Sequence, residues 1–306
     1  MIMRYDILSQ HPNVFRYCTG LRVSEFDDLW NEVQSLYEAA EERRLYRPSR
    51  QRAIGGGDRP KLDQRDQVLM GLVWLRIYPT NEVLGYLFGV SDSSASRVID
   101  RVIPVLEQAG KDTMRMPDPG RKHRRELSHL LREIPELVVV VDSFEQKVQR
   151  PANKDDRDNF YSFKKRAHTL KSQVAVDEIS GRIVDTAPSV KGRTHDLTLL
   201  KQSGLLERLP EGIGCMGDAA YQGIHDLHPL AFASRKKPWG KPRPPEDVDY
   251  NRAFSQRRTL VENSIGQLRR FQSLAQADRH HRLHHSARVN AVAGLVNRQI
   301  DRRFKH

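Results

Sequence analysis

The sequence has 306 residues, with 51 Lys and Arg against 39 Asp and Glu and a formal net charge of +12. Its 38% hydrophobic content is ordinary for a globular protein with a buried core. No apolar run approaches the roughly 18 residues of a membrane span, and the start lacks the order of a secretory signal. The two cysteines, Cys18 and Cys215, are far apart, which disfavours a disulfide scaffold or a cysteine zinc site. We therefore expect a cytoplasmic protein with no membrane span.

The positive charge is concentrated late in the sequence. Residues 251–306 contain 12 Lys and Arg against 3 acids, so this segment carries 12 − 3 = +9 of the net +12. Such a concentration suits a polyanion, and nucleic acid is the commonest one. A basic tail that is merely solvated would give the same numbers, so charge alone does not identify the partner.

The first part of the sequence predicts helices. Apolar residues from Phe26 to Tyr37 recur at helical spacing, and we interpret them as packing surface. The stretch 47–60 has three consecutive glycines and flanking prolines, which predicts a break. It lacks the Lys-Ser/Thr pair that would make it a phosphate-binding loop.

Residues 62–110 predict a second helical block. Gly89-Val90-Ser91 is a turn whose glycine can take positive φ and whose serine can cap the next helix. That next helix would bury its apolar side and present Arg97 and Arg101 outward. This is the layout of a helix-turn-helix, which places its second helix in the major groove of DNA. An ordinary three-helix bundle would show the same pattern.

After a charged connector over about 111–135, the pattern changes to strands. The run LVVVVD (137–142) has the length and β-branched composition of a buried strand. Further elements follow in chain order: strands over 171–177 and 181–190, a helix near 197–209, a short strand over 213–218, an irregular basic stretch over 234–249 and a helix near 259–274. Strands mixed with helices predict an α/β or α+β layer fold.

Two aspartates end predicted apolar strands. Asp142 follows LVVVV, and Asp218 follows GCMG. A buried acid is costly unless a metal or a cation compensates its charge. If the two strands are neighbours, the two carboxylates lie side by side. Each aspartate also fits the simpler interpretation of a turn residue.

Glu262 is the third candidate acid. Arg258 lies four residues before it and Arg269 seven after it, so all three share one face of the predicted helix. Converging carboxylates favour divalent cations, and two Mg²⁺ ions about 4 Å apart promote in-line displacement at phosphorus. The arginines would hold phosphate oxygens. A glutamate flanked by arginines also fits a surface ion pair.

With these acids the sequence resembles the DDE transposases of insertion-sequence family five and their Harbinger-like relatives. The resemblance runs in order over nearly the whole chain: LRVSEFDDLWNEV, LVWLRIYPTNEVLGYLFGVSDSSASRVI, VVVVDSFEQKVQRP, KRAHTLKSQVAVDEISGRIV, GRTHDLTLL, GDAAYQG and NRAFSQRRTLVENSIGQLRRFQSL. The GDxxYQG and RxxxE elements in this order are quite specific, whereas the helix-turn-helix alone is not.

The resemblance implies a ribonuclease-H-like catalytic domain, a mixed sheet flanked by helices, preceded by an all-α helix-turn-helix region. Residues 1–115 would be the DNA-binding region, and 130–306 the catalytic domain with a basic C-terminal tail. Catalysis and metal binding would fall to Asp142, Asp218 and Glu262, with two Mg²⁺ or Mn²⁺ ions. Water would attack a phosphodiester at the element's end, and the freed 3′-hydroxyl would attack target DNA.

The implied partner is double-stranded DNA, both terminal inverted repeats and target. A homodimer on DNA is expected because two ends must be brought together, in the cytoplasm of a bacterium and on its nucleoid. The residues expected to contact phosphate or DNA are Arg258, Arg269, Arg97, Arg101, Lys236, Lys237, Lys241 and Arg243. Two alternatives are a non-catalytic DNA-binding protein derived from a transposase and a DDE nuclease without strand transfer.

Some positions depart from the related pattern Tyr-x2-Arg-x3-Glu-x6-Lys. Ser255 replaces the tyrosine and cannot stack on a base, whereas Arg269 replaces the lysine and can still hold phosphate. Asp196, in a family His-Asp motif, is interpreted as the N-cap of the following helix rather than as a supporting metal residue. The histidine tract 280–285 has two i,i+4 pairs, and we interpret it as contacting phosphate rather than metal.

Overall fold

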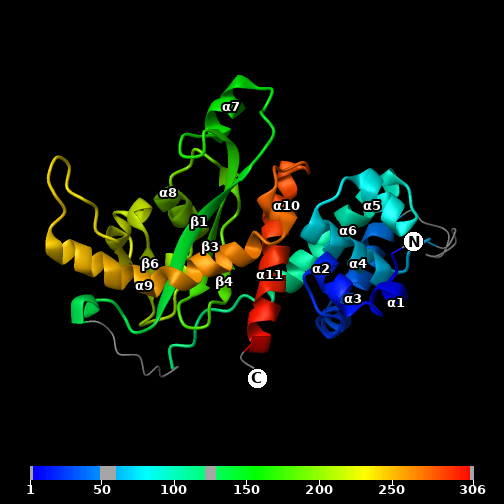
Figure 1. The fold of residues 1–306 in the computed structure, drawn as a ribbon, viewed down its shortest axis with the longest axis horizontal. Coiled ribbons are helices and arrows are strands. Elements are labelled where there is room, and N and C mark those ends of the chain that lie inside the picture. Colours follow the sequence, from blue (N-terminus) through cyan, green and yellow to red (C-terminus); the bar gives the residue numbers. More distant parts are fainter. Residues whose placement is uncertain (1–2, 49–59, 121–128, 304–306) are drawn as a thin grey trace.

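The computed structural model describes residues 3–48, 60–120 and 129–303, and it contains a mixed sheet beside a helical region (Figure 1). Most of the break predicted over 47–60 lies outside the described residues. No helix in the described part of the chain is long and apolar enough to cross a membrane.

The central strand of the sheet is β1 (Val138–Lys147). It pairs antiparallel with β3 (Ala167–Asp177) on one side and parallel with β6 (Gly214–Gly217) on the other. The remaining described strands pair with these neighbours: β7 (Ala231–Ala233) with β6, and β2 (Tyr161–Ser162), β4 (Ile183–Thr186) and β5 (Val190–Lys191) with β3.

Both faces of β1 are buried, which explains its continuous apolar sequence. Val138 and Val140 join one hydrophobic cluster, and Val139 and Val141 join another, because successive side chains of a strand point to opposite faces. The first cluster includes residues of α9 (Pro245–Leu268) and the second includes residues of α8 (Asp196–Ser203). The predicted mixed sheet flanked by helices is therefore confirmed.

The helical region confirms the predicted helix-turn-helix layout. Its elements in chain order are α1 (Tyr5–Leu8), α2 (Pro12–Thr19), α3 (Val23–Leu45), α4 (Gln64–Ile77), α5 (Asn81–Phe88) and α6 (Asp92–Lys111). Gly89 takes φ +68° at the end of α5, and the Ser91 hydroxyl accepts a hydrogen bond from the Ser94 N–H (3.2 Å) at the start of α6. The turn and cap are those expected from Gly89-Val90-Ser91.

The segment predicted to be a basic tail forms helix α11 (His285–Arg303), and much of it is buried. On one side α11 crosses α6 so closely that a Cβ added at Gly294 would overlap the backbone of Gly110. On the other, the Asn297 side chain bonds to the N–H and C=O of Ile183 in β4, each at 2.8 Å. The helix thus lies between the helical region and the sheet (Figure 1), and the domain limits 1–115 and 130–306 stay a prediction.

Several predicted boundaries are wrong, among them the end of β1 and both ends of α9. Strand β1 does not end at Asp142 but continues to Lys147, because its second half pairs with β3 alone after β6 has stopped. Helix α9 begins at Pro245, well before residue 259, and ends at Leu268. A short helix, α10 (Gln272–Ala275), follows it.

Candidate active site

The pairing of β1 with β6 brings Asp142 and Asp218 alongside each other. Val140 pairs with Met216, an offset of 216 − 140 = 76 residues, and the two aspartates have the same offset, 218 − 142 = 76. Both lie two residues beyond that pair. Since β6 ends at Gly217 and β1 continues, Asp142 stands beside the open end of the shorter strand.

Glu262 reaches the same site from α9. It is an exposed residue that, together with Asp142, lines a cavity of about 770 Å³. Asp218 is not among the lining residues, although Ala220 shortly after it is. The structure therefore brings the two aspartates together and places Glu262 on another wall of the cavity.

Helix α9 is fixed against the sheet by a buried ion pair. The Arg257 guanidinium donates to both carboxylate oxygens of Glu178, in the turn between β3 and β4, at 2.8 and 2.6 Å. The next residue, Arg258, reaches Asp142, with Nη2 3.4 Å from Oδ2. Arg258 thus supplies the positive charge beside Asp142, at a distance that makes a weak hydrogen bond.

Carboxylates are crowded around Asp142. The pKa of Asp142 is raised to about 6, mainly by burial and in smaller part by Asp218 and Asp196, whereas the Ser143 N–H and Arg258 oppose the shift. Burial also raises the pKa of Tyr221 well above its ordinary value, with the same three aspartates contributing. Negative charges that are partly removed from water and set close together favour a divalent cation between them.

The donor set fits a divalent metal in part. Asp142 and Asp218 supply two neighbouring carboxylates, the ligand type that Mg²⁺ prefers. As their side chains stand, the described residues include no group of three His, Cys, Asp or Glu that could hold a metal ion. Glu262, which lines the same cavity and is exposed, is the predicted third ligand.

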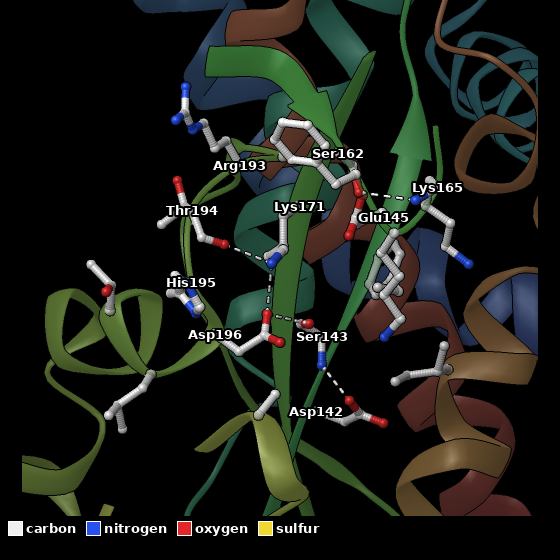
Figure 2. A pocket seen from close by; sticks show the side chains of 18 of the residues that line it. Asp142, Ser143, Glu145, Ser162, Lys165, Lys171, Arg193, Thr194, His195 and Asp196 are labelled. Atoms are coloured by element: carbon white, nitrogen blue, oxygen red, sulfur yellow. Dashed lines mark hydrogen bonds and ion pairs between the residues drawn. The ribbon is translucent and has the colours of Figure 1, made fainter. Parts of the chain in front are cut away.

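Asp196 does not cap a helix, contrary to the prediction. The N-cap of α8 is His195, and Asp196 is the first helical residue. Its Oδ1 accepts from the Lys171 Nζ at 2.8 Å and from the Ser143 hydroxyl at 2.7 Å. The Ser143 N–H in turn donates to Asp142 (2.7 Å), so hydrogen bonds connect Lys171 to Asp142 (Figure 2).

Lys171 is the site residue that the sequence interpretation missed. It lies within β3, is only 7% exposed, and also donates to the Thr194 carbonyl oxygen at 2.6 Å (Figure 2). A lysine is almost never buried without a partner, but the strand predicted over 171–177 began at Lys171 and gave no sign that this residue is buried. The partner, Asp196, lies outside that strand.

Comparison with known proteins decides the family. Residues 141–297 match the family described as DDE superfamily endonuclease, and residues 60–112 match the helix-turn-helix of DDE superfamily endonuclease. A probable transposase for insertion sequence element IS702 from Microchaete diplosiphon is 32% identical over 246 residues, covering 80% of this chain and 83% of the relative. The chain belongs to the DDE superfamily. No solved structure matches it at a significant level.

The predicted transposase function is thereby confirmed at the level of the superfamily. DDE superfamily endonucleases use divalent metals, and the helix-turn-helix match supports DNA binding. The narrower placement in insertion-sequence family five stays an expectation.

The residues that were predicted to bind DNA lie in different parts of this DDE-superfamily chain, some in the active-site cavity and others on the surface. Arg269 and Lys236 line the active-site cavity. Arg97 is exposed on α6. Arg101 does not point freely outward, because it is half-buried and approaches Glu41 at 3.9 Å. The other predicted cations are exposed in the irregular segment 234–244: Lys237, Lys241 and Arg243.

The histidine tract is only partly a surface feature. His285 is fully buried, with Nε2 2.7 Å from the Gln146 Oε1 and Nδ1 2.7 Å from the Ser189 hydroxyl. The prediction that the tract contacts phosphate is therefore wrong for His285. Ser255 is exposed on α9 and does not line the cavity.

Proposed function

We propose that this chain cleaves DNA at the ends of an insertion sequence and transfers the freed 3′ ends to target DNA. Asp142, Asp218 and Glu262 would bind two Mg²⁺ or Mn²⁺ ions. The observation that carries the proposal is the shared register of the two aspartates at a cavity that Glu262 also lines.

In the proposed site, the metal ions, the carboxylates and the cationic side chains have different roles. Two bound divalent ions would activate the attacking oxygen and stabilise the leaving one. Asp142 and Asp218 supply oxygen ligands, and Lys171 holds Asp196 beside them. Arg269 would hold non-bridging phosphate oxygens by charge-assisted hydrogen bonds. Arg258 is buried beside Asp142 and does not line the cavity, so its role would be to balance the charge of that carboxylate.

DNA would be held on two surfaces. Arg97 on α6 would contact the terminal inverted repeat in the major groove, where a helix-turn-helix places its second helix. The exposed cations of segment 234–244 would contact the backbone, with Lys236 extending this surface into the cavity. Two ends must meet for transposition, so the active form would be a homodimer on DNA.

Asp218→Asn tests the assignment. The Asp218 Oδ1 accepts a hydrogen bond from the Ala220 N–H (2.9 Å), which an asparagine oxygen can keep, so the fold should persist. Mg²⁺-dependent cleavage of a duplex carrying the inverted repeat should fall by at least about 100-fold, more than is typical for a residue outside the ligand shell. Duplex binding should be unchanged.

The control is Asp226→Asn, an exposed aspartate shortly after the same motif. It should cut like the unchanged protein. Equal cutting by Asp218→Asn would refute the assignment. Binding without any Mg²⁺-dependent cutting by the unchanged protein would favour a non-catalytic DNA-binding protein, and cutting without joined products would favour a nuclease.

A further inference from the structure

One wall of the active-site cavity carries an exposed aromatic ring. Phe163 lines the cavity and is 75% exposed. Lys164, Lys165 and Arg193 line the same cavity, so the ring shares this wall of the site with cations. An exposed ring among cations is the combination with which proteins hold single-stranded nucleic acid: the ring stacks on a base and the cations follow the backbone.

The ring is held in place before any ligand arrives. Phe163 follows β2 in a tight hairpin to β3, where the Lys165 N–H donates to the Ser162 hydroxyl at 3.2 Å (Figure 2). Tyr161 packs against Phe163 edge to face, with ring centroids 5.2 Å apart. Tyr161 also packs against His168, at 5.6 Å. An ordered ring loses little conformational entropy when it binds a ligand.

We propose that Phe163 forms a nucleobase subsite that stacks on an unpaired base at the end of a DNA strand, with Lys164 and Lys165 on the adjoining phosphates. The subsite rests on the proposed function, because it lies in the same cavity as Asp142 and Glu262. Inside a duplex both faces of each base are covered by its neighbours, so only an unpaired or terminal base offers a free face. The subsite therefore selects strand ends opened beside the carboxylates.

Binding of tailed and blunt DNA tests the subsite in the full chain. The probes are a short blunt duplex and the same duplex with a short unpaired 3′ or 5′ extension containing 2-aminopurine, with Ca²⁺ replacing Mg²⁺ to prevent cutting. At least one tailed probe should bind about 5- to 150-fold more tightly than the blunt one, the range expected for one stacked base. Its 2-aminopurine fluorescence should be quenched.

Three variants test whether Phe163 causes the tighter binding of tailed DNA and the quenching. Phe163→Ala should abolish both the preference and the quenching without changing the affinity for the blunt duplex, whereas Phe163→Trp should keep both. Tyr17→Ala is the matched control, because Tyr17 is also 75% exposed but does not line the cavity. Thermal unfolding should be unchanged in Phe163→Ala because the side chain is exposed.

Several outcomes would overturn the subsite: no preference for either tailed probe, or a preference that survives Phe163→Ala. Loss of the preference in Trp239→Ala instead would assign the stacking to that fully exposed ring in segment 234–244. The experiments distinguish a failure of the Phe163 subsite from a failure of the enzyme assignment. Asp218→Asn should keep the tail preference while losing cleavage, and Phe163-dependent binding without Mg²⁺-dependent cutting would refute only the enzyme assignment.

Discussion

Lys171 and Asp196 form an almost buried ion pair next to the proposed metal ligands, with 9% and 15% of their side chains exposed. Removing one member of a buried pair leaves the other uncompensated. Here the remaining member would be a carboxylate joined to Asp142 through Ser143. We therefore predict that the pair positions Asp142.

Lys171→Met should lower cleavage about 10- to 100-fold, the usual cost of losing a residue that orients a metal ligand. The Mg²⁺ concentration for half-maximal cleavage should rise, which distinguishes a disturbed metal site from a general loss of folded protein. Cleavage rates over a Mg²⁺ titration are the measurement.

Lys191→Met is the control, since Lys191 also pairs with an aspartate at 2.8 Å but both side chains are over 40% exposed. Such surface pairs contribute little. An unchanged Mg²⁺ requirement in Lys171→Met would contradict the positioning role.

Single residues show what the sequence could and could not predict. Asp142, Asp218 and Glu262 could be proposed because each stands in a local motif of strand or helix residues, and their catalytic role stays a prediction. Lys171 was missed, and His285 was wrongly expected to contact phosphate, because their partners are far away in sequence: Asp196 for the lysine, and Gln146 and Ser189 for the histidine. Local patterns carry no information about such long-range partners.

For helices and strands, the kind of element was predicted better than the residues at which it begins and ends. The prolines before residue 245 predicted irregular structure, yet α9 begins with a proline in its first turn, where a missing N–H costs nothing. Acidic Glu246 and Asp247 then favour the helix N-terminus. The end of β1 was misplaced because β6 stops while β3 continues, and the pairing partner of a strand is not encoded in its own residues.

The crossing of α6 and α11 depends on two glycines. Gly294→Ala should lower the free energy of unfolding by about 1–3 kcal/mol, because the added methyl group would overlap the Gly110 backbone. Gly266→Ala, in α9, is the matched control: nothing lies within 4 Å of its added Cβ. It should instead stabilise by about 0.5–1 kcal/mol through helix propensity. Urea unfolding measures both, and equal effects would contradict the close crossing.

For the whole molecule, the junction of α11 with the sheet makes stability depend on pH. The pKa of His285 is lowered to about 3, mainly by burial and in smaller part by Arg288, whereas Asp278 opposes the shift. A histidine in the unfolded chain titrates near pH 6.5. Between the folded and the unfolded pKa, His285 binds a proton in the unfolded chain but not in the folded one. The stability that neutral His285 contributes is therefore complete above about pH 6.5 and is lost as the pH falls toward 3.

The free energy of unfolding should therefore fall by about 1.4 kcal/mol per pH unit from this group alone below pH 6.5. His285→Gln keeps a polar side chain at this position without a titrating group, so its stability should decline less between pH 7 and pH 5, by roughly 2 kcal/mol. Urea unfolding at the two pH values is the measurement. Parallel slopes for both proteins would show that His285 is not the group responsible.

Because α6 and α11 touch at Gly110 and Gly294, and Asn297 ties α11 to β4, α11 connects the helix expected to read DNA with the sheet that carries Asp142. We therefore predict a constant interval between the DNA sequence that the protein recognises and the phosphate that it would cut. Adding or removing one base pair within that interval, at the end of the insertion sequence, would bring a neighbouring phosphate to the three acids. That phosphate would be rotated around the duplex relative to the original one.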